Sequence, residues 1–286
     1  MSAPAAALAE HYAHCESHLK AGDRDGWLAA LFAPADKRPH LHALGAFVLE
    51  IRNVRHRVAE ALAGELRLQW WRDAIEGEAR GDVGSHPVAA ALLDTVTRCR
   101  LPRDTLTDLI EAHRFDLYDD PMETLHHWES YCEATAAAPI RLAAIVLTGK
   151  GEPAGIAAAS HAGIALSVQW QLADLADARR PVFVPVDVLA RHGLTGTDIE
   201  AGVLTPPVAA ALADMRGIGR LHLQALRRHW TAVDAAAQPA FLAVRLVEPT
   251  FRLAERPGKD VFREPLALAP WRRQWLLWRA SRGKVA

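Results

Sequence analysis

The sequence predicts an all-α protein, and three observations support this fold class. Apolar residues recur at helical spacing along nearly the whole chain, whereas the alternation typical of strands is almost absent. One run, VFVPVDVL at residues 182–189, could pass for a strand, but Pro185 interrupts it. Half of the 286 residues are apolar, which is enough to bury a large core. No repeat or flexible linker divides the chain, so we expect one helical domain over residues 1–286.

Ten helices are expected, and proline marks the start of several. Their ranges are 4–20, 38–61, 65–80, 87–100, 103–117, 125–147, 153–177, 206–230, 239–255 and 270–282. Proline stands at or near a start in LPRDT before Leu106, in EPA after Gly151 and in TPP before Val208. Proline costs least in the first helical turn, because the N–H that it lacks would have no helical partner there.

The expected helix at 65–80 contains the run LRLQWWRDAIEG. Leu68, Trp71 and Ile75 share one helical face, and charged residues occupy the other sides. Arg72 and Glu76 stand at i,i+4 spacing, which suits an ion pair on the helix surface. The residues alone therefore favour a core helix edged with ion pairs.

The longest stretch without Asp, Glu, Lys or Arg covers residues 153–173. It is about as long as the ~20 residues that a bilayer-spanning helix needs. Ser160, His161 and Gln171 would lie in lipid without partners, however, so we expect a helix buried inside the protein. Alanine and glycine dominate it, which suits a helix that lines an apolar interior space.

Overall charge and cysteine content exclude several classes of function. The 33 basic and 34 acidic residues nearly cancel, so no global field attracts nucleic acid, and no nucleic-acid partner is expected. Cys15, Cys99 and Cys132 have no CxxC spacing, which argues against a disulfide framework and a structural zinc site. The first residues lack a basic segment followed by an apolar core, so we expect no signal peptide and a cytoplasmic location.

Several segments together resemble the squalene/phytoene synthase family. They are ALGAF at 43–47, LRLQWWRDAIEG at 66–77, FDLYDDP at 115–121, SYCEATAAAPIRL at 130–142 and ADARRPVFVPVDVLARHGL at 176–194. The resemblance covers roughly residues 11–282 and implies one isoprenoid-synthase-like helical domain around a central cavity. It does not by itself imply activity.

Active members of this family hold magnesium ions with two aspartate-rich segments, and the first of them is altered here. Mg²⁺ prefers hard oxygen ligands, which carboxylates supply, and the bound metal ions in turn bind the diphosphate of the substrate. In the aligned run ALGAFVLEIRNVRH, the aspartate positions fall on Arg52, Asn53 and His56, none of which suits Mg²⁺. Glu50, one turn before Asn53, matches the AFNxE pattern of one subgroup.

The second aspartate segment departs less from the family. In WQLADLADARRPVFVP, Asp174 matches the leading aspartate, and Asp177 is expected on the same helical face at i,i+3. The pair could hold one hydrated ion, or it could be two solvated carboxylates near Arg179 and Arg180.

Further candidates for a cavity or ligand site come from the same resemblance. They are Asp116, Tyr131, Gln171, Arg179 and Arg180. A buried, satisfied tyrosine is the simpler interpretation of Tyr131, whose hydroxyl could otherwise meet a ligand.

In lacking the first aspartate cluster, this chain resembles a non-catalytic branch of the family. That branch contains the mitochondrial complex I assembly factor of phytoene-synthase type. That resemblance implies an assembly or chaperone factor whose partner is a respiratory complex subunit or an assembly intermediate. Two alternatives stay open: an active prenyl-diphosphate synthase of squalene or phytoene type, and a non-catalytic protein that binds isoprenoids or other lipids. No cofactor is expected, and Mg²⁺ is expected only if the synthase alternative holds.

The segment PWRRQWLLWRASRGKVA at 270–286 combines tryptophan with basic residues and contains no acid. As a helix it places Trp271, Trp275 and Trp278 in one stripe. Such a stripe packs against its own domain, or it stays exposed and docks on an anionic membrane surface or an acidic partner. The second alternative implies peripheral attachment at the inner face of the membrane.

Overall fold

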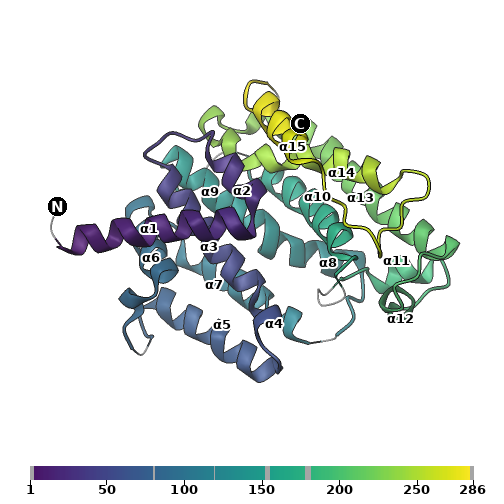
Figure 1. Cartoon of the computed structure of the whole chain (residues 1–286), viewed down its shortest axis with the longest axis horizontal. Helices are drawn as coiled ribbons and strands as arrows, with labels where there is room; N and C mark the ends of the chain where they lie inside the picture. Colours follow the sequence, from purple (N-terminus) through teal and green to yellow (C-terminus); the bar gives the residue numbers. More distant parts are fainter. Residues whose placement is uncertain (1–2, 80, 119, 152–154, 178–181, 284–286) are drawn as a thin grey trace. The chain divides into compact units, whose positions relative to one another are not determined.

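The computed structural model describes residues 3–79, 81–118, 120–151, 155–177 and 182–283 as helices joined by turns (Figure 1). No strand occurs in these ranges, so the all-α prediction is confirmed. The run at 182–189 forms no strand either. Its described part is irregular up to Pro185, which is the N-cap of helix α11 (Val186–Ala190).

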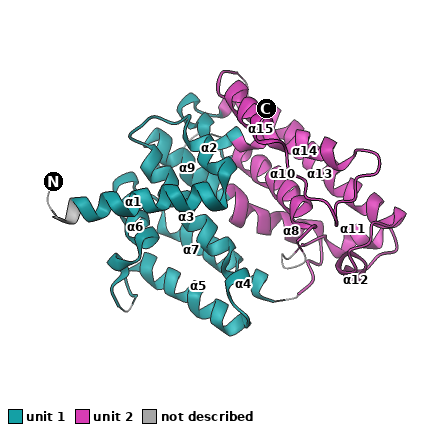
Figure 2. Cartoon of the chain, viewed as in Figure 1, with its two compact units in different colours: residues 1–118, 138–156, 233–242 teal, residues 119–137, 157–232, 243–286 magenta. Residues whose placement is uncertain are grey.

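Two compact units make up the chain, and each is built from three segments (Figure 2). Unit 1 comprises Met1–Tyr118, Ala138–Ile156 and Val233–Leu242. Unit 2 comprises Asp119–Ala137, Ala157–Ala232 and Ala243–Ala286. Because the segments alternate along the sequence, neither unit is a continuous stretch of chain. The single domain over residues 1–286 stays a prediction.

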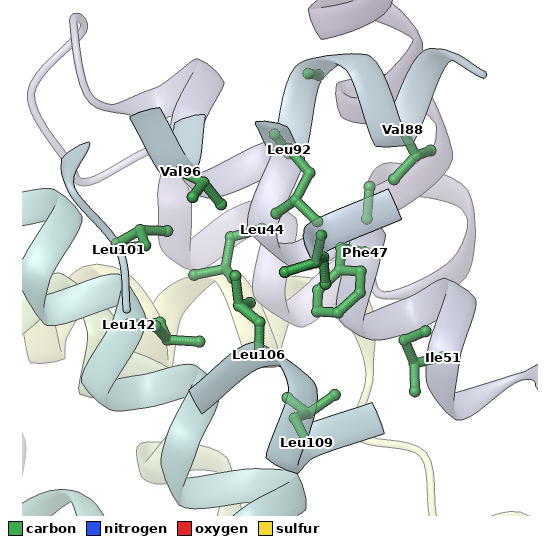
Figure 3. Packing of buried hydrophobic residues seen from close by; sticks show 14 of the residues in the cluster. Leu44, Phe47, Ile51, Val88, Leu92, Val96, Leu101, Leu106, Leu109 and Leu142 are labelled. Carbon is green, nitrogen blue, oxygen red and sulfur yellow. The ribbon is translucent and has the colours of Figure 1, made fainter. Parts of the chain in front are cut away.

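Unit 1 has a leucine-rich core in which helix α3 is central. Its helices are α1 (Ala3–Gly22), α2 (Arg24–Ala30), α3 (Arg38–Arg52), α4 (Val54–Arg57), α5 (Ala61–Glu76), α6 (Pro87–Cys99), α7 (Arg103–Ala112) and α9 (Ala138–Thr148), with 3₁₀ turns η1 (Val83–Ser85) and η2 (Phe115–Leu117). Leu44, Phe47 and Ile51 of α3 are buried against residues of α6, α7 and α9 (Figure 3). The core face predicted for α5 is confirmed, since Leu68, Trp71 and Ile75 are all buried.

The helix expected over 38–61 is interrupted at Asn53. Helix α3 ends at Arg52, a short α4 follows, Val58 is extended, and α5 begins at Ala61. Asparagine is a weak helix former, because its side chain competes for nearby backbone groups. The break falls at one of the altered aspartate positions.

Unit 2 is built around α10 (Ile156–Asp174). Its other elements are α8 (Leu125–Cys132), the π-helical turn η3 (Glu133–Ala137), α11, α12 (Gly196–Glu200), α13 (Pro206–His229), η4 (Trp230–Ala232), α14 (Val247–Ala254) and α15 (Pro270–Ser281). The 3₁₀ segment η5 (Ala235–Leu246) has residues in both units. A continuous α-helix was expected over 239–255, but the 3₁₀ segment continues to Leu246 and α14 begins only at Val247.

Small residues on α10 bring backbones close together. A Cβ built at Gly163 would lie 2.5 Å from the backbone nitrogen of Ala137 in η3. Helix α10 also contributes Val168 to a pocket of about 10 Å³ that Leu212 and Met215 of α13 help to line. That volume suits about one water molecule. The larger apolar space expected along this helix stays a prediction.

Elements α8, η3 and α9 follow one another without a break and together form a helical stretch, Leu125–Thr148. In the described part of the chain, this is the one helix that is long and apolar enough to cross a membrane by length and composition. It is not the uncharged stretch at 153–173, in which the described helix α10 is largely buried in unit 2. Sixty-one per cent of the most apolar window of Leu125–Thr148 is buried, which is typical of a core helix.

Candidate functional site

The altered first segment is centred on Glu50, which is part of an ionic cluster in unit 1. Its side chain is 12% exposed and pairs with Arg57 of α4. On the other side, Nε2 of His18 from α1 lies 2.9 Å from Oε1 of Glu50, without the geometry of a hydrogen bond. Glu50 thus links α1, α3 and α4 around the helix break, which gives it a structural role.

The three aspartate positions carry side chains that do not suit Mg²⁺. Arg52 is half-buried at the end of α3, Asn53 caps that helix, and His56 is exposed on α4. A guanidinium is a cation, and Mg²⁺ prefers carboxylate oxygen and water. Glu50, the nearby carboxylate, is already engaged by two basic groups. These residues therefore do not fit the first metal-binding segment of an active synthase.

If Glu50 is structural, removing its charge should destabilise the protein. Glu50→Gln is expected to cost about 1–3 kcal/mol, because the charge-assisted bond to Arg57 is lost in a largely buried setting. Glu76→Gln is the matched control, since Glu76 pairs with Arg72 on an exposed surface, where such a pair contributes about 0.5 kcal/mol or less. Urea unfolding followed by circular dichroism measures both. Equal effects would contradict the assignment.

The second segment stands where α10 ends. Asp174 is the last residue of α10, and Asp177 lies beyond it in a turn, where its backbone N–H donates to the Asp174 carbonyl at 2.9 Å. The expected helix through residue 177 is therefore too long, and the two carboxylates do not share a helical face. Both residues are half-buried. Arg179 and Arg180 lie outside the described residues.

Gln171 and Tyr131 converge on Phe183 in unit 2. With the amide oxygen of Gln171 oriented toward the Trp128 indole, it accepts a hydrogen bond from that indole at 2.8 Å, and the amide nitrogen donates to the Phe183 carbonyl at 2.9 Å. The Tyr131 ring packs edge-on against the Phe183 ring, with centroids 5.7 Å apart. The amide of Gln171 is thus satisfied within the protein. Trp128 and Phe183 are 55 residues apart, and no local pattern in the sequence pairs them.

Asp116 belongs to unit 1 and is buried in η2. Its Oδ2 lies 2.6 Å from Nδ1 of His113, and the two side chains are 8% and 4% exposed. Two groups buried together in this way hold the turn after α7 in place. Asp116 belongs to unit 1, whereas Tyr131 and Gln171 belong to unit 2.

A histidine cluster in unit 2 was not predicted. Nδ1 of His161 on α10 lies 3.0 Å from Nδ1 of His222 on α13, and Nε2 of His222 lies 3.2 Å from Glu129 on α8. Burial, followed by the nearby His222 and His229, lowers the pKa of His161. The described residues contain no group of three or more His, Cys, Asp or Glu arranged to hold a metal ion. Spacing in the sequence gave no signal of this cluster, because its members come from three helices.

The fold and the altered segments together define a relative of the isoprenoid synthases. The chain belongs to the squalene/phytoene synthase family, whose family model matches residues 19–279. A solved dehydrosqualene synthase superposes with a TM-score of 0.80 at 16% identity, covering 98% of each chain. At that identity the likeness shows the fold alone.

Two curated relatives differ in what they do. Complex I assembly factor 6 of Rattus norvegicus is 30% identical over 261 residues, which is 91% of this chain and 78% of the relative. Phytoene synthase of Arthrospira platensis is 24% identical over 233 residues, which is 73% of this chain and 72% of the enzyme. The family resemblance predicted from the sequence is confirmed, including its similarity to the assembly-factor branch.

Proposed function

We propose that this protein is a catalytically degenerate member of its family and serves as an assembly or chaperone factor for respiratory complex I. The single observation that carries the proposal is the set of side chains on α3 and α4, where Arg52, Asn53 and His56 stand at the family's aspartate positions. The similarity to complex I assembly factor 6 over 91% of the chain supports the same role.

The proposed partner is a complex I subunit or an assembly intermediate, and the proposed location is the cytoplasm at the inner face of the membrane. The basic side chains on α3 and α4 support a function without Mg²⁺. A bound isoprenoid or other lipid is compatible with this role, because an apolar site needs no metal to hold an apolar chain.

Deleting the gene in the organism that encodes the protein tests this role. Native gels of membranes should then show less assembled complex I, and NADH–quinone activity should fall to a small fraction of the parental level. Succinate–quinone activity serves as the control and should stay unchanged, because it does not depend on complex I. A plasmid copy of the gene should restore complex I. A deletion strain with normal complex I and altered isoprenoid lipids would instead favour a synthase.

A further inference from the structure

One side of helix α15, which belongs to unit 2, is buried. Leu276, Leu277 and Ala280 are 9%, 0% and 3% exposed. The expectation that the tryptophan stripe packs against the domain is therefore wrong, since leucine and alanine form the packing face. A deletion of the helix would expose the residues that this face covers. Its effect on folding could then not be separated from its effect on binding to a partner or a membrane.

The other side of α15 presents the three tryptophans to solvent. Trp271, Trp275 and Trp278 are 70%, 47% and 45% exposed. At about 100° per residue they lie within an arc of about 60°, so they form a line along the helix about 10 Å long. A straight row of exposed rings along a helix can touch a flat surface with all its members at once.

Arginines accompany this row, and two of them stack on it. The guanidinium of Arg279 lies 5.3 Å from the Trp275 ring centroid, and that of Arg282 lies 4.4 Å from the Trp278 ring centroid. By helical geometry Arg272 and Arg279 fall on one flank of the tryptophan line, and Arg282 is the C-cap at its end. No acidic residue follows Glu264 in the sequence, so α15 itself offers them no carboxylate.

Arg279 also acts electrostatically on another arginine, Arg245. Burial, followed by Arg227 of α13 and Arg279 of α15, lowers the pKa of Arg245. The buried Nε of Arg245 has no hydrogen-bond partner in the part of the chain that the structure describes. An anion at this position would relieve the repulsion among the three guanidinium groups and could accept their hydrogen bonds.

We propose that α15 docks unit 2 on the surface of a bilayer that contains anionic phospholipids. The row of Trp271, Trp275 and Trp278 enters the interface between head groups and acyl chains, where tryptophan is enriched in membrane proteins. The arginines on its flank contact the phosphates. A line of exposed rings beside cations matches the two attractions that bind an interfacial helix: burial of apolar area and charge. This docking goes beyond the assembly role and does not depend on it.

Sedimentation of the purified full chain with vesicles tests the docking. The chain should bind vesicles of phosphatidylcholine mixed with phosphatidylglycerol and bind pure phosphatidylcholine much more weakly. Raising the salt concentration should release it, because ions screen the attraction. Trp275→Ala combined with Trp278→Ala should weaken binding more than about tenfold, and Arg279→Ala should weaken it about fivefold.

Matched variants separate the α15 face from a general effect. Leu221→Ala removes a leucine that is 62% exposed on α13, and Arg263→Ala removes an arginine that is 82% exposed beside Asp260. Both should bind as the wild type does. All variants should keep the wild-type thermal midpoint, because the altered side chains are substantially exposed. A folded wild-type chain that stays in the supernatant with anionic vesicles at low salt overturns the proposal, as do tryptophan variants that bind normally.

Discussion

Incubated with Mg²⁺ and farnesyl or geranylgeranyl diphosphate, the purified protein is expected to form no condensation product at ordinary enzymatic turnover. Metal ions on a departing diphosphate contribute several kcal/mol to the transition state. Each loss of about 1.4 kcal/mol lowers a rate tenfold, so losing one metal cluster should slow the reaction by roughly three orders of magnitude or more. A squalene or phytoene synthase assayed in parallel is the positive control.

A metal titration separates loss of binding from a poor choice of substrate. Calorimetry should detect no Mg²⁺ binding to the wild type in the presence of a non-reactive diphosphate. The variant that combines Arg52→Asp, Asn53→Asp and His56→Asp restores three hard oxygen ligands and should bind Mg²⁺ more tightly. Product formed by the wild type, or tight Mg²⁺ binding to it, would show that other residues replace the lost carboxylates.

Helical periodicity predicted most of the fold, because burial of one helical face leaves a clear pattern in the sequence. The buried face of α5 is an example, with Leu68, Trp71 and Ile75 all in the core. Interruptions were predicted less well. The break at Asn53 and the π-helical turn η3 depend on local backbone geometry that changes the apolar pattern little.

The candidate site was predicted as a set of positions but not as a set of contacts. Alignment with a family motif located Arg52, Asn53 and His56, whereas the ionic cluster of Glu50 with His18 and Arg57 required the structure. Helical spacing likewise placed the three tryptophans of α15 in one row. It could not decide which side of α15 is buried, because leucine and tryptophan are both apolar.

Gly163→Ala is expected to be among the most destabilising single-methyl changes in this protein. The added Cβ would lie 2.5 Å and 2.6 Å from the backbone N and Cα of Ala137. No rotamer change can relieve a contact with backbone, so α10 and η3 must move apart and loosen a close-packed interior. We expect a cost of about 3 kcal/mol and a thermal midpoint lower by roughly 6–12 °C.

Two other helical glycines provide a graded control for this prediction. A Cβ at Gly219 would meet the ring of Phe251 at 2.7 Å, and a ring can shift, so Gly219→Ala should cost about 1–2 kcal/mol. Gly217 has nothing within 4 Å of its Cβ position, so Gly217→Ala should stabilise α13 by about 0.5–1 kcal/mol. Thermal unfolding followed by circular dichroism ranks the three variants. If Gly163→Ala melted at or above the wild-type temperature, the small residues of α10 would leave open space instead of allowing close packing.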